Sequence, residues 1–321
     1  MNKKRSCNTS IFQALLKSKD ILSLEAQNHI SSFISSQKYE GGGFKDRAAK
    51  PDLYYSVFGY TLSLIFGVKL NVRQEESYLN SIDKSKLDFI HTVCLIRAKF
   101  LLNLIDLQQK SGFNLKAELT EGFIGNLLIK RISKSIKKEY HGLFQVLDLY
   151  QSEDQGYNHN RRHEKQSTVY ANFLIWTLFD DLGYDEKRLE EICRANQKLN
   201  LPNGSFANEL NSSDGVTSAT AAALIMDAEQ EQSKLYLKDM YTRRGGFKAS
   251  ANVPITDLLS TATALLALKL SGEKMESFAE NSLNFINLHW DESGGFFGSI
   301  ADMTCDVEYT YYALLGIGVL S

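Results

Sequence analysis

The stretch GGGFKDRAAKPDLYYSVFGYTLSLIFG, residues 41–67, contains the pattern that decides the fold, because the same order of parts recurs along the 321-residue chain. A turn of glycines and an aromatic residue comes first, and an aspartate follows nine to eleven residues after the last glycine. An apolar segment then begins. The pattern recurs at 203–228, 245–272 and 294–321, and its aspartates are Asp52, Asp214, Asp257 and Asp306. A degenerate copy at 156–183 has Gln166 or Ser167 in place of the aspartate.

Each part of the repeat has a physical role in a helical hairpin. An aspartate at a helix start accepts hydrogen bonds from the unpaired N–H groups and complements the helix dipole. Glycines permit the positive φ of a tight turn, and the aromatic residue after them can anchor the loop on the core. The segment LLSTATALLALKL, residues 258–270, is apolar nearly all round, which indicates a helix that is buried on most sides.

Charged amphipathic segments alternate with the buried ones, for example at 185–199 and 274–290. The segments 83–107 and 118–150 also have a helical pattern, although their glycine turns are missing or displaced. Buried helices that alternate with amphipathic helices at a regular period predict two concentric rings. We therefore expect an all-α fold, an α/α toroid of the α6-α6 type built from repeated helical hairpins. It forms a single domain over 1–321, with residues 1–24 as a candidate N-terminal helical extension.

Composition excludes several classes of protein. The net charge is −2, so there is no electrostatic footprint for nucleic acid. The four cysteines lie far apart without a CxxC pair, which favours a reducing compartment over a disulfide framework. No window approaches the length of apolar sequence that a membrane span needs. From the sequence we expect a cytoplasmic protein without a membrane span.

Two of the repeats resemble those of a known protein family. GGFFGSIADMTCDVEYTYYALLGIG (294–318) and GGGFKDRAAKPDLYYSVFGY (41–60) are similar to repeats of protein prenyltransferase β subunits and the related terpenoid cyclases. The resemblance implies a central cavity that holds an isoprenoid chain among aromatic side chains, with the diphosphate near the mouth. The same aromatic residues also suit a plain core: Tyr54, Tyr55, Phe58, Tyr60, Tyr170, Phe173, Trp176, Tyr309, Tyr311 and Tyr312. Of these, Tyr170, Trp176, Tyr309 and Tyr312 are candidate substrate-binding residues.

The catalytic motifs of the family do not carry over intact. The resemblance implies a zinc site made by an Asp-x-Cys pair and a His in an Asp-x-x-His-Thr segment. Here Asp257 is kept but Leu259 stands where the Cys belongs, and Tyr309 stands where the His belongs. Leucine cannot bind zinc and a neutral phenol is a poor ligand, so zinc is not expected. The acid motif of the cyclases, Asp-x-Asp-Asp, is reduced to Asp257 alone, which leaves this residue as the one candidate acid there.

A displaced version of the motifs occurs in the first repeat. Arg47 and Lys50 match an Arg-x-x-Lys diphosphate loop, and Asp52 opens the helix with Tyr54 in the position of the Cys. The next helix carries Asp88-Phe-Ile-His91-Thr92, which matches the Asp-x-x-His-Thr form. A shifted catalytic site at Asp52, Tyr54 and His91 is one interpretation. Coincidence between repeats of common descent is the other.

Two further segments are candidates for phosphate chemistry. The loop HNRRHE (159–164) presents Arg161 and Arg162, which could hold a diphosphate by bidentate hydrogen bonds or could form a solvated surface loop. DDLGYD (180–185) imitates a magnesium clamp, but a loop between an inner and an outer helix is the favoured interpretation. Mg²⁺ remains a cofactor that a diphosphate substrate could bring.

Three hypotheses on function follow, and whether the protein is an enzyme stays open among them. The first is an isoprenoid-processing enzyme with a non-standard active site, which transfers a prenyl group or cyclises a terpenoid. The second is a zinc-dependent protein prenyltransferase β subunit that needs a helical partner chain. The third is a non-catalytic toroid that binds an isoprenoid or a protein. The partners considered are therefore an isoprenoid small molecule, a helical partner chain or a second copy of this chain.

Overall fold

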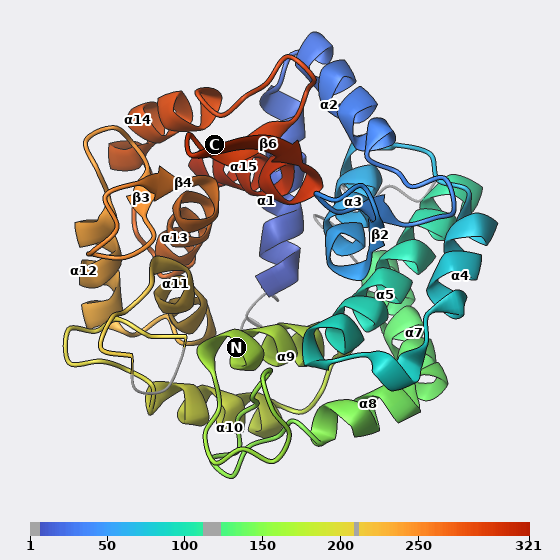
Figure 1. The fold of residues 1–321 in the computed structure, drawn as a ribbon, viewed down its shortest axis with the longest axis horizontal. Helices are drawn as coiled ribbons and strands as arrows, with labels where there is room; N and C mark the ends of the chain where they lie inside the picture. Colours follow the sequence, from blue (N-terminus) through green and yellow to red (C-terminus); the bar gives the residue numbers. More distant parts are fainter. Residues whose placement is uncertain (1–6, 112–122, 209–211) are drawn as a thin grey trace.

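The computed structural model describes residues 7–111, 123–208 and 212–321 and shows two concentric rings of helices (Figure 1). The inner ring consists of α3 (Leu53–Phe66), α5 (Phe89–Ser111), α9 (Val169–Leu182), α11 (Thr217–Met226), α13 (Leu258–Leu270) and α15 (Val307–Leu320). The outer ring consists of α2 (Leu24–Ser36), α4 (Val72–Ser81), α7 (Phe123–Glu139) with α8 (His141–Asp148), α10 (Glu186–Gln197), α12 (Glu231–Met240) and α14 (Glu276–Asn287). The predicted all-α toroid is confirmed. Residues 118–122 of the predicted helical segment 118–150, and residues 1–6 of the predicted extension, lie outside the described residues.

The Gly-aromatic turns form the same contact in every copy of the repeat. The aromatic residue is fully buried or nearly so and forms a β-bridge to the residue six positions earlier, as in Lys38–Phe44 and Tyr241–Phe247. Its backbone N–H donates to a short polar side chain one turn into the following inner helix. These pairs are Phe44–Ser56, Tyr157–Asn172, Phe206–Thr220, Phe247–Thr261 and Phe296–Thr310. The Ser, Thr and Asn residues at the starts of the inner helices therefore fasten each turn to its helix.

Aspartate caps begin three of the inner helices, as the sequence predicts. The Asp52 carboxylate accepts a hydrogen bond from the Tyr55 N–H, Asp257 from the Ser260 N–H, and Asp306 from the Tyr309 N–H. Each of these aspartates also ends a two-stranded hairpin: β1 (Phe44–Lys45) with β2 (Pro51–Asp52), β3 (Phe247–Lys248) with β4 (Thr256–Asp257), and β5 (Phe296–Ser299) with β6 (Asp302–Asp306).

Two of the predicted helix starts are wrong. Helix α9 is capped by Thr168, whose hydroxyl accepts from the Ala171 N–H, and not by Gln166 or Ser167. Asp214 does not cap α11, because the chain stays extended for two more residues and the cap position falls on Val216. The Thr217 hydroxyl instead donates to the Lys248 carbonyl of the next hairpin. At α11 a contact with the neighbouring hairpin accompanies the shift of the helix start. At α9 the Ser167 hydroxyl donates to Asp154 of the preceding loop, and the cap falls one residue later.

Helix α1 (Cys7–Ile21) runs across the ring rather than along it (Figure 1). Its first residues contact the last turn of α9, where the Cys7 N–H donates to Asp180 and the Asn8 amide donates to Asp181. Near its other end, the Lys19 ammonium donates to the Ile65 carbonyl in the last turn of α3. Gly318 in α15 permits a close crossing, because a Cβ atom there would overlap the backbone of Ala14. Helix α1 therefore lies across the end of the ring at which the inner helices finish.

The helices of the inner ring are largely buried. Most residues of α11, α13 and α15 are buried. Among the described residues, no helix has the length and the apolar composition to cross a membrane.

Candidate functional site

The opposite end of the ring, at which the inner helices begin, is the candidate site, and we call it the N-terminal rim. Its residues come from the starts of adjacent inner helices and from the hairpins before them. His91 of α5 approaches Asp52 before α3, and Tyr54 of α3 donates to Glu308 of α15. The Thr217 contact joins α11 to the hairpin before α13. Helix N-termini carry a partial positive charge, so this end of the ring favours negative groups.

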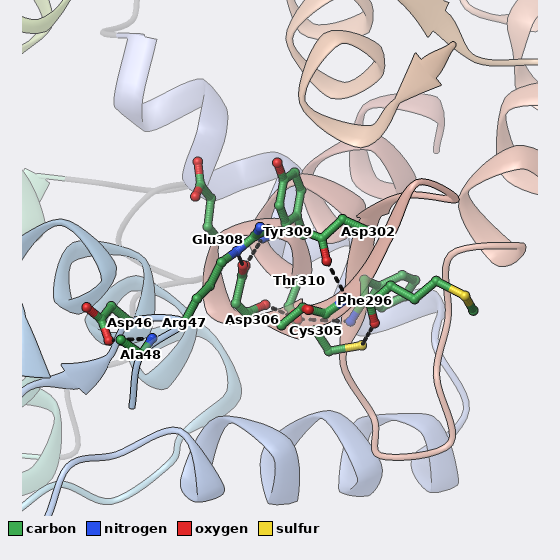
Figure 2. A network of polar contacts seen from close by, with 12 residues as sticks. Asp46, Arg47, Ala48, Phe296, Asp302, Cys305, Asp306, Glu308, Tyr309 and Thr310 are labelled. Atoms are coloured by element: carbon green, nitrogen blue, oxygen red, sulfur yellow. Dashed lines mark hydrogen bonds and ion pairs between the residues drawn. The ribbon is translucent and has the colours of Figure 1, made fainter. Parts of the chain in front are cut away.

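Arg47 connects the first and last repeats across the rim. Its guanidinium extends from the loop between β1 and β2 toward the start of α15, as Figure 2 shows. Its Nε lies 3.0 Å from an Asp306 carboxylate oxygen, its Nη1 pairs with Asp302, and it stacks over the Tyr309 ring at 5.2 Å. Burial by itself would lower the pKa of Arg47, but the hydrogen bond and charge of Asp306 raise it above the ordinary value. For Asp306, burial disfavours the charged carboxylate and so raises its pKa, although the Tyr309 N–H and Arg47 oppose this shift.

His91 lies between two carboxylates. Its Nδ1 is 2.8 Å from Asp88 and its Nε2 is 3.8 Å from Asp52. The interaction with Asp52, assisted by the hydrogen bond to Asp88, raises the pKa of His91 to about 9 although burial opposes the shift. Burial acts to raise the pKa of Asp52, but the interaction with His91 and the Tyr55 N–H outweigh it and leave that pKa below its usual value. The structure therefore brings the predicted pair Asp52 and His91 together as an ion pair.

Tyr54, the third member of the predicted catalytic group, points to a different residue. Its hydroxyl donates to Glu308 over 2.6 Å. Burial raises the pKa of Glu308 to about 7, even though the Tyr54 hydrogen bond lowers it. Sequence reasoning missed this glutamate. A signal was present, since Glu308 is the one charged residue in the otherwise apolar helix VEYTYYALLGIGVL.

Aromatic rings from the inner helices lie near Tyr54 and Glu308. Phe58 lies 5.0 Å from the Tyr54 ring, 5.1 Å from Tyr311 and 5.8 Å from Tyr312, all between ring centroids. Burial raises the pKa of Tyr170 on α9, and the charge of Glu308 adds to this shift. Tyr54, Phe58, Tyr170, Phe173, Tyr311 and Tyr312 are all partly exposed although they lie on the inner ring. We call these six residues the axial aromatic group.

Other predicted residues lie apart from this group. Tyr60 is fully buried and donates to Glu75 of α4, so it packs between the rings and does not face the axis. Trp176 is the exception, because it is partly exposed like Tyr170 and Phe173 on the same helix and packs against the same core cluster as Phe173. The loop residues Arg161 and Arg162 are exposed: Arg161 is 3.9 Å from Glu164, and Arg162 stacks over Tyr150 at 5.4 Å. Lys50 is exposed on the same loop as Arg47.

The position of Asp257 suits a helix cap. One carboxylate oxygen accepts from the Ser260 N–H at 2.7 Å, and the other accepts from the Ser260 hydroxyl at 2.8 Å. Burial raises the pKa of this carboxyl although both Ser260 hydrogen bonds lower it. Both oxygens are therefore engaged with the start of α13.

The residues at the family's zinc positions do not fit a zinc ion. Leu259 and Tyr309 offer no thiolate and no imidazole, and Asp257 is engaged with Ser260. Within the described ranges, no three His, Cys, Asp or Glu residues are grouped in a way that could hold a metal ion.

The acidic pair of the DDLGYD segment lies at the other end of the ring. Asp180 and Asp181 belong to the last turn of α9 and contact the start of α1, as described above. Burial raises the pKa of Asp181 to about 7, against the charge of Arg97 and the Asn8 hydrogen bond. This pair holds α1 in place and is remote from the rim.

The fold agrees with a defined class, the helical toroids of prenyltransferase type. The family model described as the prenyltransferase alpha-alpha toroid domain matches residues 8–96, 124–228 and 218–321. The chain belongs to this family. No curated protein sequence matches it.

Solved structures share the fold at low sequence identity. Candida albicans protein geranylgeranyltransferase-I complexed with GGPP is 13% identical, with a TM-score of 0.59 over 90% of this chain and 89% of that chain. A glycosidase is 11% identical, with a TM-score of 0.55 over 99% of this chain and 100% of its own. A glycosidase E335A variant in complex with glucose gives a TM-score of 0.54 at 11% identity, over 99% of each chain. At these identities the likeness concerns the fold alone.

Proposed function

We propose that the protein is an isoprenoid-processing enzyme, which binds a prenyl diphosphate or another terpenoid inside the ring and transfers or cyclises it at a non-standard active site. The observation that carries this proposal is the axial aromatic group. Rings from α3, α9 and α15 keep part of their surface exposed on the inner ring, and one of them, Tyr54, donates to the Glu308 carboxyl group. An apolar chain in contact with such rings would be stabilised by about 0.8 kcal/mol per buried methylene.

The rim offers positions for the diphosphate. Arg47 and Lys50 lie on the loop before α3, and in this proposal they bind the diphosphate, together with Mg²⁺ if the substrate brings it. Arg47 already pairs with Asp302 and Asp306, so binding would require it to exchange one of these partners. The exposed pair Arg161 and Arg162 is a second group of cations on a loop before an inner helix. The relative complexed with GGPP shows that a toroid of this type can hold such a ligand.

A thermal-shift series tests the proposal. Geranyl, farnesyl and geranylgeranyl diphosphate should raise the melting temperature progressively, and inorganic diphosphate should raise it less. A ligand at one hundred times its Kd stabilises the folded state by about 2.7 kcal/mol. The substitution Tyr312→Leu should reduce the ligand-induced shift. If all of these ligands leave the melting temperature unchanged, the ring interior is not an isoprenoid site.

A matched variant separates loss of binding from loss of stability. Tyr236 lies on the outer helix α12, and its hydroxyl donates to the Gly215 carbonyl. Tyr236→Leu should lower the melting temperature of the free protein but leave the ligand-induced shift unchanged. Mass spectrometry of the incubated ligands then distinguishes turnover from binding alone. The non-catalytic toroid is the second candidate, favoured by the structural use of Asp257 and Asp306 as helix caps.

A further inference from the structure

We propose that Glu308 is the base that removes a proton from the acceptor in a prenyl transfer, and that the acceptor is a small molecule with a phenolic hydroxyl group. This inference rests on the proposed function, because it takes a prenyl diphosphate as the donor. It assigns to one carboxylate the activation of the acceptor that a metal ion would otherwise supply.

Glu308 differs from the helix-capping residues Asp257 and Asp306 in the way its oxygens are used. Asp257 accepts hydrogen bonds with both oxygens, and Asp306 accepts with one oxygen from Tyr309 and with the other from Arg47. For Glu308, the described part of the chain provides one hydrogen bond, from Tyr54 to Oε1. Its second oxygen is therefore available to a ligand. The Tyr54 hydroxyl also fixes the orientation of the carboxylate, as a base needs for a short proton transfer.

The surroundings of Glu308 give it a proton affinity suited to a base near neutral pH. Burial raises the pKa of the carboxyl to about 7, and a catalytic base is most effective when its pKa lies near the working pH. Asp306 adds to the shift, whereas the Tyr54 hydroxyl and Arg47 oppose it. The other ionisable groups that feel the charge of Glu308 are phenols from three inner helices: Tyr55, Tyr170, Tyr309 and Tyr312. Among the groups that shift the pKa of Glu308, which are Tyr54, Asp306 and Arg47, the cation is Arg47.

The nature of the acceptor follows from the side chains around the carboxyl group. The axial aromatic group offers ring faces and edges, which attract another aromatic ring in offset or edge-to-face geometry. The pairs already present have this form, with Tyr54 and Phe58 at 77° and Tyr311 and Tyr312 at 81° between ring planes. A phenol can take a place in such a cluster and present its hydroxyl to Glu308. An aliphatic alcohol would forgo these ring contacts.

The step balances without a metal or an oxidant. The Glu308 carboxylate takes the phenolic proton while the phenolic oxygen forms a bond to C1 of the prenyl group. The bond between C1 and the diphosphate oxygen breaks, and its electron pair leaves with the diphosphate. The products are an aryl prenyl ether, diphosphate and the protonated form of Glu308, which returns its proton to water. The ring faces stabilise the positive charge that develops on the prenyl group.

The experiment uses the full chain with farnesyl diphosphate and Mg²⁺, and 1-naphthol as the acceptor. Cyclohexanol and N-acetylcysteine serve as the non-aromatic acceptors. Mass spectrometry measures the prenylated product in the wild type, in Glu308→Gln and in the control Glu276→Gln. Glu276 is an exposed glutamate in the first turn of the outer helix α14, so the control makes the same chemical change away from the rim. Thermal shift by farnesyl diphosphate is measured in all three proteins.

We expect transfer to 1-naphthol in preference to the other acceptors, with a rate that rises with pH through about 7. Glu308→Gln should lower this rate by 10²- to 10⁴-fold and remove that limb of the pH profile, while the farnesyl diphosphate shift and the control remain as in the wild type. A wild type that binds farnesyl diphosphate but prenylates no phenol would overturn the inference and leave isoprenoid binding intact. Undiminished transfer by Glu308→Gln would also overturn it. Absence of any farnesyl diphosphate shift would instead refute the proposed function itself.

Discussion

The substitution Glu308→Gln should change how the stability of the folded protein depends on pH. Below about pH 4.5 the carboxyl is protonated in both the folded and the unfolded chain, so the wild type and the variant should differ by a constant amount. Between pH 4.5 and 7 the unfolded chain releases this proton and the folded chain keeps it. The free energy of unfolding of the wild type therefore falls as pH rises through this window.

The size of the effect follows from the two proton affinities. The carboxyl titrates at about 7 in the folded chain and at 4.5 when unperturbed. Each tenfold difference in proton affinity corresponds to about 1.4 kcal/mol, and the side chain keeps some contact with water, so we expect a penalty of about 2–3 kcal/mol. Glutamine carries no charge at any pH and still accepts the Tyr54 hydrogen bond. Relative to the wild type, Glu308→Gln should gain this amount between pH 4.5 and 8.

Urea unfolding at pH 4.5, 6, 7 and 8 measures the difference in unfolding free energy between the two proteins. Taking the difference cancels the contribution of Asp181, whose pKa burial also raises to about 7. Glu276→Gln, on the exposed first turn of α14, is the matched control for the loss of one carboxylate. A difference between wild type and Glu308→Gln that is independent of pH would show that Glu308 is solvated like an ordinary surface glutamate, and the reasoning would fail.

Three further predictions concern the contacts that hold the rim and α1. The wild type should lose stability as pH rises from about 6.5 to 9, because the imidazole of His91 loses its proton and stops pairing with Asp52 and Asp88. In His91→Gln this pH-dependent loss should be absent. Urea unfolding midpoints across this pH range measure the difference. Arg47→Ala should lower the free energy of unfolding, measured with urea, by about 1–3 kcal/mol because it leaves buried Asp306 without its cation. Lys50→Ala on the same loop should change it very little. Equal losses in the two variants would contradict the role of Arg47. Gly318→Ala should displace α1 at a cost of about 1–3 kcal/mol in unfolding free energy and expose Cys7, whose thiol pKa burial raises to about 12. Peptide mass spectrometry should then show faster alkylation of Cys7. An unchanged alkylation rate would disprove the close crossing of α1 and α15.

The parts of the fold that the sequence predicted are those that depend on local chemistry. Glycine turns, aspartate caps and apolar segments all act through neighbours within about fifteen residues, so the repeats predicted the double ring and the caps at Asp52, Asp257 and Asp306. The failed helix start at Asp214 lies where a contact with the next hairpin competes with the local signal. Near Ser167, the hydroxyl of that residue donates to Asp154 of the preceding loop, and Thr168 caps the helix instead.

The candidate site could be predicted only in part for the same reason. The approach of His91 to Asp52 was within reach, because the two residues begin consecutive inner helices. The Tyr54–Glu308 hydrogen bond joins residues 254 positions apart, and Arg47 reaches Asp306 across 259 positions. Closure of the ring brings the first repeat into contact with the last, and no pattern within one repeat predicts a contact between residues so far apart in the sequence. The position of α1 across the ring has the same origin, since its partners belong to α3, α9 and α15.

The sequence by itself therefore determined the class of fold, since periodic burial and capping are properties of short segments. The tertiary structure alone decided which side chains meet at the rim and how strongly they hold their protons. A carboxyl group acquires a raised pKa from desolvation by residues that fold around it, and those residues come from helices that only ring closure brings together. For this reason Glu308 was one charged residue in an apolar helix when seen in the sequence, and is the centre of an aromatic site in the folded protein.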